Sequence, residues 1–221
     1  MVKPTSKTST IYWFILIAAI FFSFFIRLRL SHMPLERDEG EFAYIAQLIL
    51  DGESPFEAYN YKIPGVSYMY VLFMSVFGET ETGIRMGVAI VNIISLIFLF
   101  LIVRRLINPF AAAIAAFVYA FMSLDQGVLG NPAHATQYLN MFVLAGIYVY
   151  LKAKEHQGMQ KFYLMLSGFL TGMAFIMKQP AALFILLIIF FMVVEFIKTP
   201  SYKITKLISN GLLFGAGAII R

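Results

Sequence analysis

The stretch that decides the fold is IRMGVAIVNIISLIFLFLIV, residues 84–103, which is followed directly by Arg104 and Arg105. Arg85 is its only charged residue, and a helix that crosses a membrane needs about 20 mainly apolar residues. The whole chain of 221 residues is 60% hydrophobic, with a mean hydropathy of +0.80. Soluble domains are only about 45–50% apolar. The sequence therefore predicts an integral membrane protein.

Apolar stretches of this kind recur along the chain, which predicts an all-α polytopic membrane protein with about seven transmembrane helices. The first stretch is longer than the apolar region of a signal peptide, so we interpret it as a retained signal anchor. Short spans are tolerated where neighbouring helices or local thinning of the bilayer cover the mismatch. The chain ends inside the last span, so we expect it to be either the N-terminal part of a longer protein or a module that needs a partner subunit. The expected spans are 11–30, 84–103, 109–124, 137–151, 162–177, 180–197 and 207–221.

The distribution of charge predicts the orientation in the membrane. The chain has 17 Lys and Arg against 12 Asp and Glu, and the cations form short clusters at the ends of the spans. Cytoplasmic loops carry the excess of Lys and Arg, which places the N-terminus inside and the long segment 31–83 outside. The basic clusters form no patch of aromatic residues and Arg, so a nucleic-acid partner is not expected. There is no cysteine, which excludes disulfides and thiolate metal sites.

Segment 31–83 combines a cluster of charges with two helical patterns. Residues 35–52 read LERDEGEFAYIAQLILDG, in which the acidic start is followed by an amphipathic repeat. The apolar residues of that repeat have the spacing of one helix face: Phe42, Ile45, Ala46 and Ile49. Residues 66–77, VSYMYVLFMSVF, are apolar but too short to span. We therefore predict two interfacial helices in this extracytoplasmic loop, near 39–50 and near 66–77.

Two carboxylates stand at the start of the first of these helices. Asp38 and Glu39 lie where the loop meets the bilayer, and a carboxylate there can act as a general base toward a lipid-delivered substrate. The spacing of Asp38 and Glu41 also fits a capping box, in which Asp38 would only start the helix. Both interpretations stay open from the residues alone.

Three cations near the expected outer face are candidates for binding an anionic lipid headgroup. They are Lys62 in KIPG, Arg85 in GIRMG and Lys178 in IMKQP. The structural alternative is that Lys178 snorkels to the interface and that Arg85 anchors its span there.

The histidines show no spacing that is typical of metal ligands. His134 lies in the second outer loop, GNPAHATQ, and His156 on the inner side. A metal site formed by His32 and Asp38 is kept as an alternative. No cofactor is expected, and a divalent metal ion stays an open alternative.

Four elements occur in order along the chain: RDEGEFAYIAQLILDG, KIPG, FGETETGIRMG and GFLTGMAFIMKQPAA. Over residues 11–187 this order resembles the integral-membrane glycosyltransferases of the GT-C class. The closest resemblance is to the dolichyl-phosphate-mannose protein mannosyltransferase family and its bacterial relatives, including lipid A aminoarabinose transferases. It implies that residues 1–221 form a GT-C-like transmembrane module, in a bacterial or archaeal plasma membrane. The implied activity transfers a sugar, with inversion, from a polyprenyl-phosphate donor to a protein, lipid or glycan acceptor at the extracytoplasmic face.

The resemblance also implies roles for particular residues. Asp38 matches the first acid of the family's Asp-Glu pair and would be the catalytic carboxylate. Glu39 matches the second acid and would assist or orient it. Lys62 and Lys178 match the two lysines that would hold the carrier phosphate, and Arg85 would contribute to the same contact.

The chain departs from the family pattern at two further positions. Gln137 stands where many relatives carry a second acid, and Tyr61 stands where the aminoarabinose enzymes have Glu, which weakens any inherited metal site. These departures keep a second function open, a non-catalytic membrane subunit that binds polyprenyl phosphate or a partner enzyme. A transporter fragment is a third alternative, but the charges lie at helix ends rather than at mid-span, where coupling residues are usual.

Overall fold

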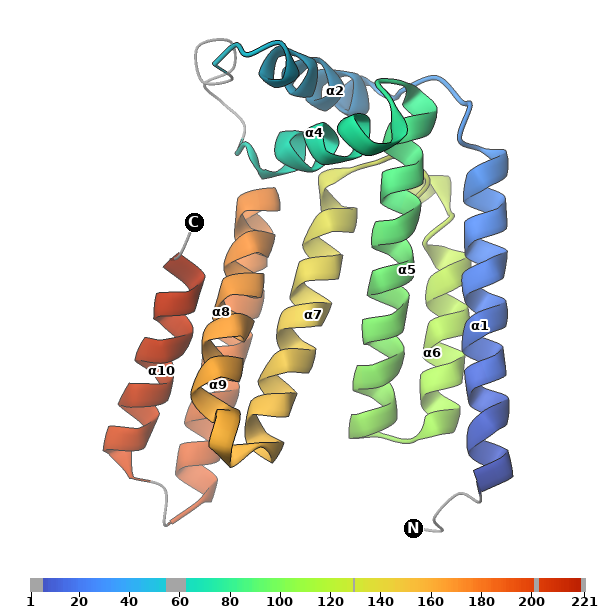
Figure 1. Ribbon diagram of the computed structural model, residues 1–221. Coiled ribbons are helices and arrows are strands. Elements are labelled where there is room, and N and C mark those ends of the chain that lie inside the picture. Colours follow the sequence, from blue (N-terminus) through green and yellow to red (C-terminus); the bar gives the residue numbers. More distant parts are fainter. Residues whose placement is uncertain (1–5, 55–62, 129, 201–202, 220–221) are drawn as a thin grey trace. The chain divides into compact units, whose positions relative to one another are not determined.

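The computed structural model describes residues 6–54, 63–128, 130–200 and 203–219, and within them every regular element is a helix. The chain divides into two compact units, residues 1–138 and 139–221, and the boundary falls within α7. Each unit is described by itself. The helices, labelled as in Figure 1, are α1 (Ser6–Arg29), α2 (Arg37–Leu50), α4 (Gly65–Phe77), α5 (Glu81–Leu106), α6 (Pro109–Met122), α7 (Ala135–Glu155), α8 (Gln160–Met177), α9 (Ala182–Lys198) and α10 (Ile204–Ile219).

The helices confirm an all-α polytopic membrane protein. Within the described ranges, three helical stretches are long and apolar enough to cross a bilayer, Thr10–Arg29, Glu81–Leu106 and Gln179–Lys198. Shorter apolar helices are α4, α6 and α10. A helix covers most of the described part of each of the seven expected spans. That all seven cross the membrane stays a prediction.

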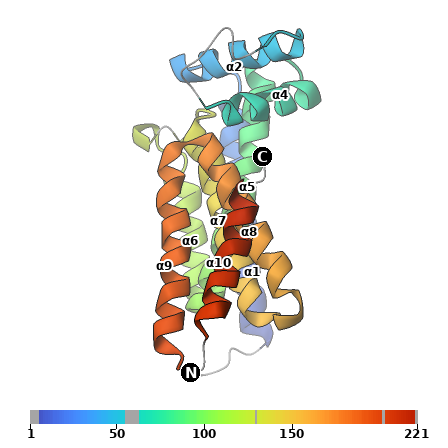
Figure 2. The ribbon, with the colours of Figure 1, turned by 90° about the vertical axis from the view of Figure 1, so that its left-hand side faces the viewer.

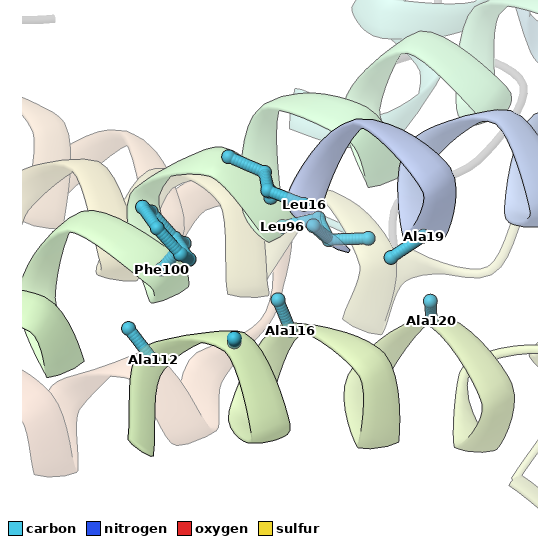
Figure 3. Packing of buried hydrophobic residues seen from close by; sticks show 8 residues of the cluster. Leu16, Ala19, Leu96, Phe100, Ala112, Ala116 and Ala120 are labelled. Atoms are coloured by element: carbon cyan, nitrogen blue, oxygen red, sulfur yellow. The ribbon is translucent and has the colours of Figure 1, made fainter. Parts of the chain in front are cut away.

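The helices α1, α5 and α6 of the first unit run alongside one another (Figure 1). Alanines on one face of α6 allow a close approach, and Figure 3 shows them facing the larger side chains of α1 and α5. Small residues at such contacts are typical of helix packing in membranes, where dispersion contacts between side chains replace the hydrophobic effect. The buried cluster consists of Leu16, Ala19, Leu96, Phe100, Ala112, Ala113, Ala116 and Ala120.

The helices α2 and α4 lie across one end of α1 and α5, rather than alongside them (Figure 1). Both predicted helices of segment 31–83 are confirmed within about two residues at each end. The apolar repeat also has its predicted role, because Phe42, Ile45 and Ala46 are buried. The crosswise placement agrees with an interfacial position, which stays a prediction. This end of the first unit, called the crossed end below, carries the candidate site.

One glycine allows α4 to pack against α5. A Cβ atom at Gly87 would overlap the ring of Phe73, which is itself buried against α5. We therefore expect Gly87→Ala to lower the free energy of unfolding by about 1–3 kcal/mol, because overpacking forces the neighbour to move. Alanine is intrinsically the better helix former, so a loss can only come from this clash. Denaturant titration in detergent micelles measures it.

Gly40→Ala is the matched control for this prediction. Gly40 also lies within a helix of the first unit, and a Cβ atom there would meet nothing within 4 Å. The control should be neutral or stabilising by up to about 1 kcal/mol. Equal effects at Gly40 and Gly87 would contradict the proposed packing.

The second unit is held together by a glycine-rich seam between α8 and α10. Cβ atoms at Gly168 and Gly217 would overlap backbone atoms of Phe214 and Met165, so only glycine permits this approach. Figure 2 shows α8 and α10 side by side, with α9 antiparallel to α10. A salt bridge of 2.8 Å joins Lys154 of α7 to Glu195 of α9. The residues after α8 carry Lys178.

Candidate active site at the crossed end

The first turn of α2 is capped two residues earlier than the sequence pattern suggested. The N-cap is Glu36, whose side chain accepts a hydrogen bond of 2.9 Å from the backbone N–H of Asp38. The side chain of Glu39 in turn accepts a hydrogen bond of 2.9 Å from the backbone N–H of Glu36, which completes a capping box. The alternative that Asp38 and Glu41 form the box is therefore wrong. Asp38 lies inside the first turn, where its charge still suits the helix dipole.

Glu39 forms a buried ion pair with Arg85 of α5. Their side chains are 1% and 4% exposed, and Arg85 Nη2 lies 2.9 Å from Glu39 Oε2. A second bond of 3.4 Å runs from Arg85 Nε to Glu39 Oε1. Buried charges need such pairing, because transfer of an isolated ion from water is very costly. The pair ties the start of α2 to α5.

Arg85 also donates hydrogen bonds to the backbone that links α1 to α2. Its Nη1 bonds to the carbonyl of Leu30 at 3.0 Å, and its Nη2 to that of Pro34 at 2.9 Å. The guanidinium is thus occupied by Glu39 and by two carbonyls. Its predicted contact with a carrier phosphate stays a prediction.

Side chains from several helices hold the segment 130–134 next to the ion pair of Glu39 and Arg85. The backbone N–H of Ala133 donates to Glu39 Oε1 at 2.6 Å, and the Tyr70 hydroxyl donates to the carbonyl of Ala133 at 2.8 Å. Burial, and then the nearby Tyr138 and Glu39, raise the pKa of Tyr70 well above its ordinary value. Tyr70 therefore keeps its proton, and its donor role, throughout the physiological pH range.

Arg27 of α1 holds the other end of this segment. It is buried, and its Nη1 donates to the carbonyl of Gly130 at 2.8 Å, while Nη2 donates to that of Ser123 at 2.7 Å. Gln137 donates to the same Gly130 carbonyl at 2.9 Å. A carboxylate cannot donate that bond. The residue that departs from the family's second acid therefore has a structural function here.

His134 is brought beside Asp38 by these contacts. Its Nε2 lies 3.8 Å from Asp38 Oδ2, although 96 residues separate the two in the sequence. The side chains are 16% and 31% exposed, so both reach the surface of the crossed end. Sequence reasoning missed this pair, because neither residue carries a spacing that indicates the other. The one available signal was that both fall in loops expected on the outer side.

The remaining candidates belong to the second unit, have other contacts within the first unit, or fall outside the described residues. Lys178 belongs to the second unit, where it follows α8 in extended conformation and its backbone N–H caps the helix by bonding to Ala174. Lys62 lies outside the described residues. His32 Nδ1 lies 3.2 Å from Thr82 Oγ1. Among the described residues, no three His, Asp or Glu side chains converge as ligands for a metal ion.

A comparison with protein-family models gives a match over residues 61–217. The family is described as dolichyl-phosphate-mannose-protein mannosyltransferase. The chain belongs to this family. The matched range includes Lys62, Arg85, His134 and Lys178, and it begins after Asp38 and Glu39. Comparisons with curated proteins and with solved structures give no match.

Membership confirms the resemblance found in the sequence. The chain is an integral membrane glycosyltransferase of the GT-C type, and the family works on a lipid-linked sugar donor and an acceptor. The family does not by itself name the sugar, the acceptor or the catalytic residues of this chain. Those belong to the proposal that follows.

Proposed function

We propose that the protein transfers a sugar from a polyprenyl-phosphate donor to an acceptor hydroxyl, at the extracytoplasmic face of a bacterial or archaeal plasma membrane and with inversion. The acceptor is a hydroxyl of a protein, lipid or glycan. Asp38 is the proposed general base, and Glu39 with Arg85 positions it.

The proposed reaction is a single displacement at the anomeric carbon of the sugar. The acceptor oxygen bonds to this carbon as its proton passes to the carboxylate of Asp38. The bond from the anomeric carbon to the phosphate oxygen breaks, and its electron pair leaves with polyprenyl phosphate. Attack on the face opposite the leaving group inverts the configuration, as in inverting glycosidases with one carboxylate base.

The accessibility of Asp38 is the observation that carries the proposal. Glu39 is buried and accepts hydrogen bonds on both oxygens, which leaves it to orient rather than to take a proton. Asp38 is next to it and 31% exposed, and Glu36 rather than Asp38 is the N-cap. A carboxylate at the surface of the crossed end can meet a hydroxyl from solution and a sugar from the membrane.

The leaving phosphate needs cations, and the proposal assigns Lys62 and Lys178 to it. The negative charge on phosphate grows as the bond breaks, so an ammonium aimed at it stabilises the transition state. Lysine suits this task as a compact point charge. The proposal gives Arg85 a positioning role, supported by its bonds to Glu39 and to the α1–α2 connection.

Donor binding tests the proposal. In membranes from cells that express the protein from its own gene, we expect transfer to depend on a polyprenyl-phosphate sugar. Lys178→Met removes the charge and keeps the apolar stem. It should raise the KM for this donor about tenfold to a hundredfold, since hydrogen bonds to charged groups are worth about 1.5–3 kcal/mol.

Lys198→Met is the matched control. Lys198 is the last residue of α9, whereas Lys178 lies just before the first turn of that helix. It should leave the KM at the parental value. Direct use of a nucleotide sugar, without the lipid donor, would overturn the proposed donor. Tight carrier binding with no transfer to any hydroxyl would instead favour the non-catalytic subunit.

A further inference from the structure

We infer that His134 is the positioning residue that aligns the carboxylate of Asp38 toward the acceptor hydroxyl. The inference rests on the proposed function, in which Asp38 is the base, and it adds a residue from a separate loop. The juxtaposition that carries it is His134 Nε2 at 3.8 Å from Asp38 Oδ2. That separation exceeds a hydrogen bond, but catalytic hydrogen bonds are often long without substrate and shorten in the complex.

The contacts of the other ring nitrogen, Nδ1, determine which nitrogen of the His134 ring carries the proton. The backbone N–H of Thr136 donates to His134 Nδ1 at 3.4 Å, and the Thr136 hydroxyl lies 3.1 Å from the same nitrogen. A nitrogen that accepts a hydrogen bond carries no proton, so the proton of the neutral ring is on Nε2. This is the nitrogen that faces Asp38. His134 therefore presents an N–H donor to Oδ2.

The backbone on either side of His134 is fixed, so the ring is held in place. The N–H of His134 donates to the carbonyl of Pro132 at 2.8 Å, and its carbonyl accepts from the N–H of Gln137 at 2.9 Å. The adjacent Ala133 is held by Glu39 and Tyr70. The same Glu39 that fixes the start of α2 thus also fixes the segment that carries His134.

The inference assigns the second oxygen of Asp38, Oδ1, to the acceptor. Arg37 is the charged side chain beside it, at 3.6 Å from Oδ1, and that arginine is 92% exposed. Such an exposed pair is weak and screened by salt, so it restrains the carboxylate little. Alignment by His134 matters because a base misplaced by about 1 Å can cost about a hundredfold in rate.

Two amide substitutions at His134 separate its roles. Asn places its amide near the position of Nδ1, toward Thr136, whereas Gln reaches the position of Nε2, toward Asp38. We expect His134→Asn to lower kcat about tenfold to a hundredfold, with the donor KM within twofold of the parent. His134→Gln should keep at least about a third of the parental kcat, because its amide N–H can replace the Nε2 donor.

Transfer kinetics in native membranes, with protein amount measured by immunoblot, give the result. His32→Ala is the matched control, since His32 lies at the same end of the first unit and contacts Thr82. It should be parental. Equal loss in His134→Asn and His134→Gln, or parental kcat in His134→Asn, would overturn the inference. Parental transfer in Asp38→Asn would instead overturn the proposed base, whichever way the two His134 variants behave.

Discussion

Replacing Asp38 with asparagine is expected to lower the rate of sugar transfer about 10²–10⁴-fold while the fold stays intact, because a general base contributes a factor of that size. Asparagine keeps the shape of the side chain and removes the charge that takes the proton. The capping bonds at the start of α2 come from Glu36 and Glu39, so the substitution leaves them in place. The loss of a partly exposed charge from the first turn weakens its interaction with the helix dipole, which costs about 0.3–1 kcal/mol.

Asp51→Asn is the matched control for this substitution. Asp51 is the C-cap of the same helix and is exposed, so the control removes an identical charge at the opposite end of α2. Its transfer rate should be parental. Circular dichroism and thermal unfolding in detergent check that both variants fold. An Asp38→Asn protein that folds and transfers at a parental rate would end the case for Asp38 as the base.

The helices of the crossed end could be predicted because their signals are local. The spacing of Phe42, Ile45 and Ala46 marks one face of a helix, and all three are buried in α2. The apolar stretch of α4 is bounded by Pro64 and Gly78, and Gly78 has a positive φ of 93°. Periodicity and turn residues act over a few positions, so a single sequence shows them.

The register of the cap could not be predicted from the same stretch. Glu36 with Glu39 and Asp38 with Glu41 are both acids three residues apart, and both fit a capping box. The choice depends on Arg85 and Ala133, which bind Glu39 from 46 and 94 residues away. These distant partners are buried, so they outweigh the small difference between two exposed caps.

The pairing of Asp38 with His134 lies beyond sequence reasoning for a related reason. The loop of His134 is held at the crossed end by Arg27, Gln137 and Tyr70, each of which donates to a backbone carbonyl of that loop. Backbone acceptors are the same at every residue, so side-chain patterns cannot reveal which carbonyl is chosen. The sequence thus offers Asp38 as a candidate catalytic carboxylate, which stays a prediction, but it does not indicate that His134 lies beside it.

Glu39→Gln is expected to lower the free energy of unfolding by about 3–5 kcal/mol, the usual cost of removing one partner from a buried ion pair. Both oxygens of Glu39 accept bonds, one from Ala133 N–H and Arg85 Nε, the other from Glu36 N–H and Arg85 Nη2. Glutamine has a single side-chain oxygen. Its amide would therefore face donors, and Arg85 would lose its counter-charge.

The double variant Glu39→Gln with Arg85→Met separates the ion pair from the bonds to the backbone. Removal of both charges should recover part of the loss, because residues in direct contact couple by about 0.5–3 kcal/mol. Recovery should be incomplete, since the N–H of Ala133 and the carbonyls of Leu30 and Pro34 stay buried without Arg85 and Glu39. Denaturant titration in micelles measures both variants, and a Glu39→Gln protein within about 1 kcal/mol of the parent would contradict the assignment.

Glu39→Gln should also show whether Glu39 acts as a catalytic residue or only positions other groups. Glu39 holds the start of α2, which carries Asp38, and the N–H of Ala133, which precedes His134. If Glu39 acts only by holding these two segments, substrate binding at low temperature should order them and restore part of the transfer rate in Glu39→Gln. Binding to the folded form stabilises it by mass action, so raising the donor concentration should raise the folded fraction. A loss of kcat in fully folded Glu39→Gln, at saturating donor, that is as large as the loss in Asp38→Asn would contradict a purely positioning role for Glu39.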